Sequence, residues 1–312
     1  MDLLEISENN RKAKKPLYYT FWGLLSVMRG YNILIIGIAQ YLASIFIFKP
    51  NQSLKSILLD GHLFIVVFAT SLVIASGYII NNFYDSEIDK INKPIKSKID
   101  SFVSQKSKLR VYFFLNLTAF LFSFFVSWRA AVFFSVYIFL IWLYSHKLKK
   151  FPLTGVLSAA VLAMLPFFVI FVYHKNISEI VFIHAAYLFF IILIRELIKD
   201  LESLKGIFVL NYQNIPVKYG EHFTKILISV STVLALNPVY FLWSYPEIGM
   251  MRYYFYLVFV SLLGFVVFLW KAKSKKHYNI LHNLLKILIV LGVFSLSLID
   301  TSVIIARIIQ KL

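Results

Sequence analysis

The chain has 312 residues, of which 60% are hydrophobic and only 15% are charged, and its formal net charge is +17. About a quarter of the residues in soluble globular domains are charged, so this composition excludes that class. The sequence contains no cysteine, which excludes disulfides, thiolate metal sites and cysteine nucleophiles.

Long apolar segments follow a polar, basic N-terminal stretch, and each is long enough to cross a bilayer. We therefore predict an all-α, polytopic membrane protein with nine transmembrane helices. Residues 1–20 are predicted to form an N-terminal tail and residues 21–312 a single transmembrane domain. In chain order the predicted spans are 21–48, 62–84, 109–128, 130–146, 151–173, 179–198, 224–244, 252–270 and 284–307.

Lysine and arginine are abundant in every second polar connection and sparse in the others. This alternation is typical of the positive-inside rule. It predicts an integral protein of the cell (inner) membrane with the N-terminus in the cytoplasm and the C-terminus outside. The same alternation explains the positive net charge without a nucleic-acid partner, and no obligatory protein partner is inferred.

Two acidic stretches follow the second and the sixth predicted span. In NNFYDSEIDK, at 81–90, the residues Asn81, Asp85 and Asp89 recur every four positions and so share one helix face. In RELIKDLE, at 195–202, Glu196 and Asp200 repeat this spacing. The predicted topology places both stretches on the cytoplasmic side.

Carboxylate and amide oxygens suit Mg²⁺, which proteins bind through one or two carboxylates together with substrate phosphates. The two stretches therefore predict a site that holds Mg²⁺ around a diphosphate, with neighbouring lysines and arginines neutralising the remaining charge. Such a site favours departure of the diphosphate from an allylic chain. Two other interpretations remain open, because acids and lysines at helix ends can snorkel to water and intramembrane acids can couple cations to transport.

These stretches resemble the motifs of the UbiA superfamily of intramembrane prenyltransferases. The first family motif reads N-D-x-x-D-x-x-x-D followed by N-R-P, and this chain has NNFYDSEID at 81–89 and NKP at 92–94. The second reads close to R-E-I-x-K-D-I-E-D-x-x-G-D in members with an archaeal lipid-type acceptor, and here Ser203 and Ile207 stand where acids are usual. The retained residues of this motif are Arg195, Glu196, Lys199, Asp200, Glu202 and Gly206.

Two shorter segments extend the resemblance over the whole chain. YSHKLK, from Tyr144 to Lys149, is similar to the family's Y-S-x-x-L-K after the fourth helix, where the lysine meets the diphosphate. Arg29 and Asn32 resemble the R-P-x-N of the first helix, with Gly30 in place of the proline.

The resemblance implies nine helices around a lipid-open cavity, capped on the cytoplasmic side by two acidic loops. It implies Mg²⁺-dependent transfer of a polyprenyl group from a polyprenyl diphosphate to a lipophilic acceptor in membrane lipid. The second motif favours geranylgeranylglyceryl phosphate as the acceptor, while an aromatic acceptor of quinone biosynthesis and a catalytically impaired member remain alternatives. The implied metal ligands are Asn81, Asp85, Asp89, Glu196 and Asp200, the implied diphosphate-binding residues are Arg29, Asn32, Lys96, Lys149 and Lys199, and the implied catalytic residues are Asp85, Asp89, Asp200 and Tyr144.

Overall fold

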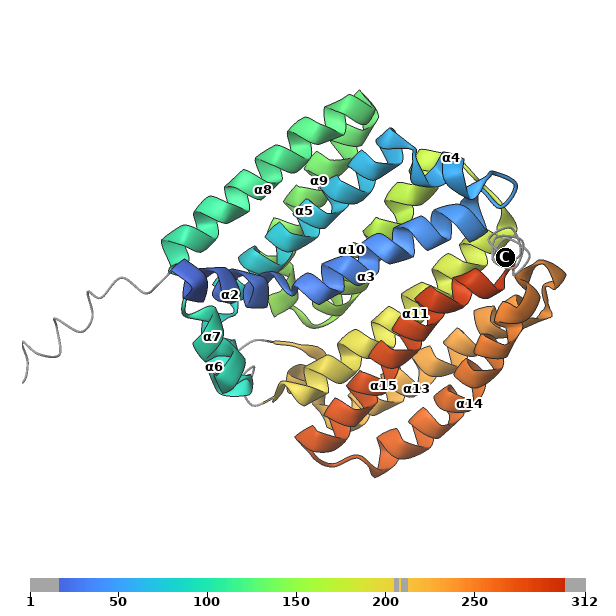
Figure 1. Ribbon diagram of the computed structural model, residues 1–312. Coiled ribbons are helices and arrows are strands. Elements are labelled where there is room, and N and C mark those ends of the chain that lie inside the picture. The colour runs from blue at the N-terminus through green and yellow to red at the C-terminus, as the bar shows by residue number, and fades with distance from the viewer. Residues whose placement is uncertain (1–16, 205–207, 209–212, 301–312) are drawn as a thin grey trace, which may run out of the picture.

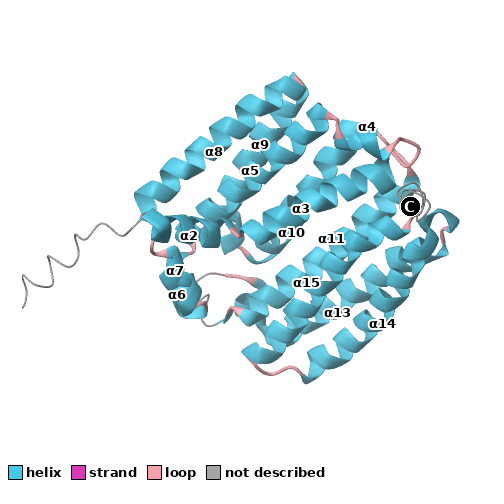
Figure 2. Cartoon of the chain, viewed as in Figure 1, coloured by secondary structure: helices cyan, strands magenta, loops and turns pink. Residues whose placement is uncertain are grey.

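The computed structural model describes residues 17–204, 208 and 213–300, and every regular element within them is a helix (Figures 1 and 2). Nine helical segments in this described part are long and apolar enough to cross a membrane. The predicted class and number of spans are confirmed.

The elements are named here in chain order. They are α2 (Leu17–Met28), α3 (Gly30–Ala43), η1 (Ser44–Phe48), α4 (Leu54–Leu58), α5 (Gly61–Tyr84), α6 (Ser86–Asn92), α7 (Pro94–Asp100), α8 (Gln105–Val126), α9 (Trp128–His146), η2 (Leu148–Lys150), α10 (Pro152–His174), α11 (Glu179–Glu202), α13 (Ile215–Ser244), η3 (Pro246–Met251), α14 (Arg252–Lys271), α15 (Lys275–Ser295) and η4 (Leu296–Leu298).

The long helices run roughly along one direction and close into a ring of neighbours (Figure 1). Helix α5 packs on α8 and α9, while α11 packs on α10, α13 and α15. Helix α3 contacts both α5 and α15 and so joins the two halves of the ring. The second and sixth spans, α5 and α11, therefore lie in different halves, with α3 and α10 packed between them.

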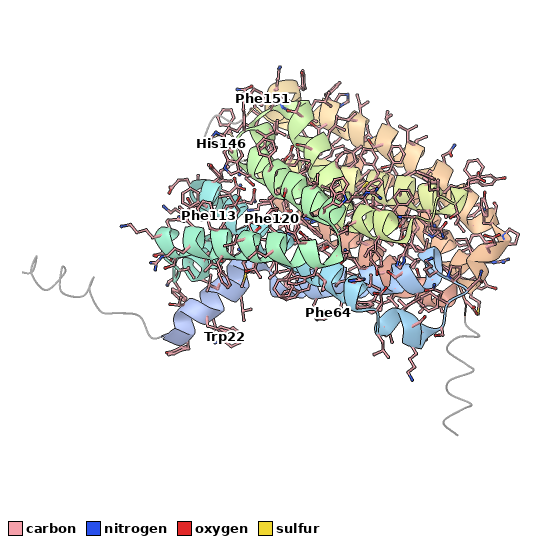
Figure 3. All side chains as sticks on the ribbon, turned by 90° about the horizontal axis from the view of Figure 1, so that it is seen from above. Trp22, Phe64, Phe113, Phe120, His146 and Phe151 are labelled. Atoms are coloured by element: carbon pink, nitrogen blue, oxygen red, sulfur yellow. The ribbon has the colours of Figure 1, made fainter. Side chains whose placement is uncertain are left out.

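Large aromatic side chains project from the outside of this ring, among them Trp22, Phe64 and Phe113 (Figure 3). Their exposed fractions are 61%, 59% and 65%. Water-facing surfaces of soluble proteins rarely carry so large an apolar area. In a bilayer, lipid covers these side chains, and helices satisfy their own backbone groups without water.

The first span differs from the prediction because the helix breaks at Arg29. This residue adopts a left-handed conformation, φ 52° and ψ 55°, between α2 and α3. Such a conformation is unfavourable for a residue with a side chain. The break leaves the guanidinium half-buried over the ring of Tyr78, at 5.1 Å from the ring centroid, instead of inside a continuous apolar helix. The prediction of one helix over 21–48 is wrong, and the span runs from Gly30 to Phe48.

Two later spans begin earlier than predicted. Span nine starts at Lys275 rather than at residue 284 because its first polar residues face other helices, and it ends at Leu298. Span seven starts at Ile215 rather than at residue 224, with a bend at Gly220, where φ is 86°. Residues 301–307 of the predicted last span lie outside the described residues, as do residues 1–16 of the predicted tail, while residues 17–20 belong to α2.

One end of the bundle carries the short helices. Helices α2, α6 and α7 gather there, whereas α15 runs from this end of the bundle towards the opposite end (Figure 1). The first acidic stretch thus forms helical cover over this end. The second loop expected in a cap falls largely on residues 205–207 and 209–212, which lie outside the described residues.

Candidate functional site

The first acidic stretch converges on one lysine from another part of the chain. Asn81 lies in the last turn of α5 and Asp85 follows at the C-cap. Lys149, in the turn η2 between α9 and α10, places its Nζ 2.5 Å from Asp85 Oδ1 and 3.3 Å from Asn81 Oδ1. Its side chain is only 8% exposed. An ammonium group therefore occupies the point where two oxygens of the motif meet.

A glycine allows this turn to approach the next helix. A Cβ atom on Gly155, in the first turn of α10, would lie 3.1 Å from the carbonyl oxygen and 3.2 Å from the Cα of Lys149. Such contacts are tighter than nine in ten of those that real Cβ atoms make, so the turn would have to shift by a few tenths of an ångström. Gly155 thus permits the packing that directs Lys149 towards α5.

The second acidic stretch lies at the end of α11. Lys199 Nζ donates to Glu196 Oε2 at 2.6 Å, and Arg195 lies 4.0 Å from the other oxygen of Glu196. Because Glu196 and Asp200 are one helical turn apart, they share a face of α11.

One pocket lies between Lys149 and the second stretch. Its charged and polar lining comes from the two acids Glu196 and Asp200, from Lys149 and Lys199, and from Tyr144 at the end of α9. Asp85 reaches this pocket through its ion pair with Lys149. The structure therefore brings Tyr144, Lys149, Lys199 and Asp200 to a single place, with Asp85 beside it, whereas Asp89, Arg29, Asn32 and Lys96 do not line this pocket. The remaining lining residues are Phe151, Pro152, Gly155, Val156 and Ala159.

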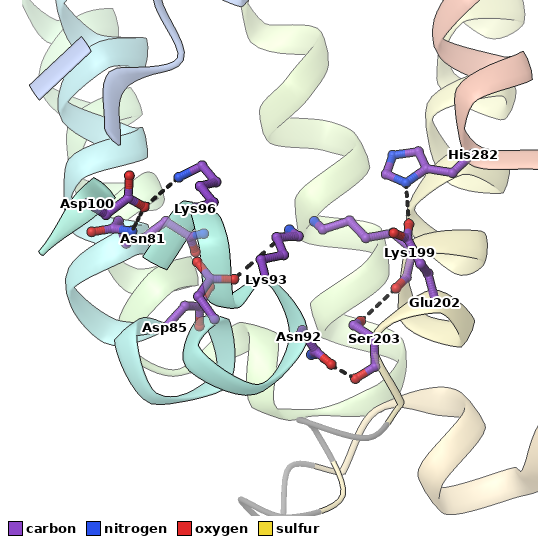
Figure 4. A network of polar contacts seen from close by, with 12 residues as sticks. Asn81, Asp85, Asn92, Lys93, Lys96, Asp100, Lys199, Glu202, Ser203 and His282 are labelled. Carbon is purple, nitrogen blue, oxygen red and sulfur yellow. Dashed lines mark hydrogen bonds and ion pairs between the residues drawn. The ribbon is translucent and has the colours of Figure 1, made fainter. Parts of the chain in front are cut away.

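Helix α6 carries Asp89, the last acid of the first stretch. Asp89 Oδ1 lies 4.0 Å from Lys93 Nζ. Burial lowers the pKa of Lys93, with Arg29 and Lys199 lowering it further while Asp89 and Glu202 oppose them. Lys93 and Lys199 extend towards each other from the two halves of the molecule (Figure 4). Positive charge is thus concentrated where the two stretches face each other.

Hydrogen bonds tie this cap to the opposite half. Asn92 Nδ2 donates to the carbonyl of Ser203 at 3.0 Å (Figure 4), and Lys275 Nζ donates to the carbonyl of Asn92 at 2.7 Å. Ser203 stands where the family pattern has an acid, and Gly206 and Ile207 of that pattern lie outside the described residues.

Arg29 and Asn32, which were predicted to bind the diphosphate, both contact Tyr78, one helical turn before the first acidic stretch. Arg29 stacks on the ring of Tyr78, and Asn32 Nδ2 donates to its hydroxyl at 3.1 Å. Tyr78 was missed by the sequence analysis, although it precedes Asn81 by three positions on the same face of α5. Its spacing of three residues from Asn81 was the signal in the sequence that could have identified it.

Lys96, which was predicted to bind the diphosphate, forms an ion pair with Asp100. Its Nζ lies 2.5 Å from Asp100 Oδ2 (Figure 4), and Asp100 also accepts from Ser26 at 2.7 Å and Asn82 at 2.9 Å. Lys108, from α8, donates to Asn82 Oδ1 at 2.8 Å. This buried network fastens α7 to α2, α5 and α8. A role for Lys96 in binding a diphosphate requires that its ion pair opens.

Helix α15 contributes residues that the sequence analysis assigned to a loop. His282 Nδ1 lies 2.6 Å from Glu202 Oε2 (Figure 4), and Asn279 Nδ2 donates to Glu202 Oε1 at 3.0 Å. The spacing of Asn279, His282 and Lys286 marks one polar helix face and was the signal that could have found them.

The predicted metal ligands are not gathered into one cluster. Among the described residues, no three His, Cys, Asp or Glu side chains lie close enough to hold a metal ion by themselves. Asp85, Asp89 and Glu196 each face a lysine. The donor chemistry nevertheless fits Mg²⁺, because Asn81 and Asp85 oxygens converge on a positive charge, here that of Lys149. Phosphate oxygens commonly complete the ligand shell of Mg²⁺ in such sites.

Comparison with known proteins adds the family. Residues 41–290 match the profile of the UbiA prenyltransferase family. A digeranylgeranylglyceryl phosphate synthase from Thermococcus sibiricus is 30% identical over 283 residues, which cover 87% of this chain and 94% of the relative. The corresponding enzyme from Pyrococcus furiosus is 28% identical over 210 residues, 67% of this chain and 73% of the relative.

Solved structures share the fold. A structure of a digeranylgeranylglyceryl phosphate synthase superposes with a TM-score of 0.66 at 21% identity, covering 89% of this chain and 97% of its own. A UbiA homolog from Archaeoglobus fulgidus, bound to GPP and Mg²⁺, superposes with a TM-score of 0.61 at 14% identity, covering 88% and 99%. At these identities the superpositions establish the shared fold.

Proposed function

Because this chain belongs to the UbiA prenyltransferase family, we propose that it transfers a geranylgeranyl group from geranylgeranyl diphosphate to geranylgeranylglyceryl phosphate. The family makes the chain a membrane prenyltransferase and decides against a transporter. The relatives named above support the glycerol phosphate acceptor over an aromatic one, since both are digeranylgeranylglyceryl phosphate synthases.

One observation carries the proposal for this chain's own residues. Lys149 and Lys199 line the same pocket, beside Tyr144, and each is held by a single carboxylate of a different acidic stretch. Two cations that face one small pocket can bind the two phosphates of a diphosphate. The carboxylates keep these cations in place until the substrate arrives.

The reaction follows from this charge arrangement. When the allylic C–O bond breaks, both electrons remain on the diphosphate oxygen, and Lys149 and Lys199 stabilise the added negative charge. The acceptor hydroxyl oxygen forms the new C–O bond to the allylic carbon. Its proton passes to the departing diphosphate, so that atoms and charges balance. Tyr144, in the pocket wall, orients the diphosphate by donating its hydroxyl hydrogen.

The carboxylates that the lysines release become available to a divalent cation. Asn81, Asp85, Asp89, Glu196 and Asp200 would hold Mg²⁺, in keeping with the Mg²⁺ bound to the Archaeoglobus fulgidus homolog. Bound Mg²⁺ neutralises charge on the diphosphate and so lowers the barrier to its departure.

The site is proposed to face the cytoplasm. The basic connections cluster at the end that carries α6 and α7, and the positive-inside rule assigns that end to the cytoplasm of the cell membrane. A water-soluble diphosphate leaving group then departs into the cytoplasm, while prenyl chains stay in lipid.

The decisive experiment is incubation of the purified protein with labelled geranylgeranyl diphosphate and alternative acceptors, with and without Mg²⁺. We expect an ether product with geranylgeranylglyceryl phosphate and none with 4-hydroxybenzoate or homogentisate. Product from an aromatic acceptor alone would replace the proposed acceptor. Binding of the diphosphate without turnover of any acceptor would identify a catalytically impaired member.

A further inference from the structure

Helix α11 presents a second charged face, separate from the pocket. Arg195 precedes Glu202 by two helical turns, and both face α15, which packs against α11 along its length. Lys286 lies one helical turn after His282, the partner of Glu202, and so belongs to the same region between α11 and α15. Arg195 and Lys286 lie outside the pocket lining, whereas Lys199 borders both regions.

The carboxylates nearby do not neutralise these cations. Both oxygens of Glu202 are already engaged, by His282 at 2.6 Å and by Asn279 at 3.0 Å. Glu196 lies 4.0 Å from Arg195 and is bonded to Lys199 at 2.6 Å. Within the described residues, the Nε of Arg195 is buried without a hydrogen-bond partner, and Lys286 has no ion pair.

Lys286 is too deep to act as an ordinary interfacial anchor. It lies eleven residues after the first residue of α15, Lys275, which corresponds to about 16 Å along a helix. The side chain of Lys286 is exposed and therefore projects into open space, not into packed protein. Ionisable residues at such depth face the bundle interior or a water-filled cavity and generally mark a ligand site. An arginine whose Nε has no hydrogen-bond partner and whose contact with Glu196 is long, beside a lysine without an ion pair, favours a bound anion.

We propose that Arg195 and Lys286 bind the phosphate monoester of the acceptor. This inference rests on the proposed function, which supplies an acceptor that carries a phosphate. The donor diphosphate occupies the face of α11 with Glu196, Lys199 and Asp200, and the acceptor phosphate occupies the adjacent face. The two anions then lie on neighbouring faces of one helix, which brings the acceptor hydroxyl towards the allylic carbon. Arg195 and Lys286 are positioning residues that determine specificity for phosphorylated acceptors.

The test compares two acceptors in three variants. Lys286→Met keeps nearly the length of the side chain and removes its charge. Arg195→Gln removes the other charge and shortens the side chain, and Lys276→Met is the matched control on the exposed start of α15. Kinetics are measured with geranylgeranylglyceryl phosphate and with geranylgeranylglycerol, which lacks the phosphate.

We expect the KM for the phosphorylated acceptor to rise about 10-fold to 100-fold in Lys286→Met and in Arg195→Gln, because each substitution removes one charge-assisted hydrogen bond to the phosphate. The KM for geranylgeranyl diphosphate and the rate with geranylgeranylglycerol should stay within about threefold, and Lys286→Arg should restore most of the loss. A preference for the phosphorylated acceptor that survives both substitutions overturns the proposal. An increase in the KM for the diphosphate instead assigns the cations to the donor site and also overturns it.

A binding measurement separates this inference from the proposed function. Radiolabelled geranylgeranylglyceryl phosphate is titrated into each variant in nanodiscs without the donor. Binding to the wild-type protein that is lost in Lys286→Met supports the phosphate site even where no product forms, and then only the proposed reaction fails. Wild-type product formation with unchanged acceptor binding in Lys286→Met leaves the reaction intact and removes the phosphate site.

Discussion

The ion pair between Asp85 and Lys149 gives the sharpest test of the site. Asp85→Asn keeps the size of the side chain and its capacity to accept a hydrogen bond, but it removes the negative charge. Glu87→Gln, two positions later, is the matched control. Glu87 is paired with Lys90 at the surface, where the two side chains are 64% and 61% exposed.

The structure sets the expected magnitudes. At 2.5 Å and an effective dielectric constant of about 20, the gross attraction of the Asp85–Lys149 pair is about 7 kcal/mol, much of which desolvation offsets. Because asparagine still accepts a bond from Lys149, we expect the free energy of unfolding to fall by about 3 kcal/mol, the lower end for a broken buried pair. The exposed control pair should cost less than about 1 kcal/mol. Turnover in Asp85→Asn should fall about 100-fold to 1000-fold, because one fixed charge at the diphosphate site is lost.

Prenyl transfer at limiting Mg²⁺ and thermal unfolding followed by tryptophan fluorescence measure the two effects. Added inorganic pyrophosphate should recover part of the stability of Asp85→Asn, since its oxygens replace the lost partner of Lys149. Activity and stability of Asp85→Asn equal to those of Glu87→Gln would refute the reasoning, because Asp85 would then be a solvated helix end.

Three further outcomes are expected. Gly155→Ala should displace the turn η2 and reduce turnover about 10-fold to 100-fold, whereas Gly264→Ala, which meets no atom within 4 Å, should leave turnover unchanged; equal activities would show that the close packing is unnecessary. Asp100→Ala should lower the free energy of unfolding by about 3 to 5 kcal/mol, because it leaves Lys96 and the buried amide of Asn82 without their acceptor, and a loss below about 1 kcal/mol in thermal unfolding would contradict this. A topology reporter inserted at Ser101 should report the cytoplasm and one fused after residue 312 the outside, so that a common side for both would exclude the proposed orientation.

The sequence determined the class of the protein, because crossing a bilayer demands long apolar segments that are visible in any single chain. It also located both acidic stretches, since the spacing of Asn81, Asp85 and Asp89 is a property of one helix. The alternation of basic connections predicted that both stretches lie at the same end of the bundle. In the structure, α6 and α7 lie at the end where α11 terminates.

The sequence could not place the ends of the spans where polar residues face protein instead of water or lipid. His282 and Asn279 look like loop residues in a hydropathy pattern, whereas in the structure both bond to Glu202 from within α15, which begins at Lys275 after the N-cap Ser274. The left-handed residue at Arg29 was equally hidden, because the stacking partner that favours the break belongs to α5.

The tertiary structure decided which charged side chains contact each other. Lys149 joins Asp85 across 64 positions and His282 joins Glu202 across 80, whereas Lys96 turns to Asp100, four positions away. Helical spacing fixes only the face on which a side chain lies. Its partner depends on how the helices pack around the centre, and that packing results from many contacts between distant segments that no local pattern encodes.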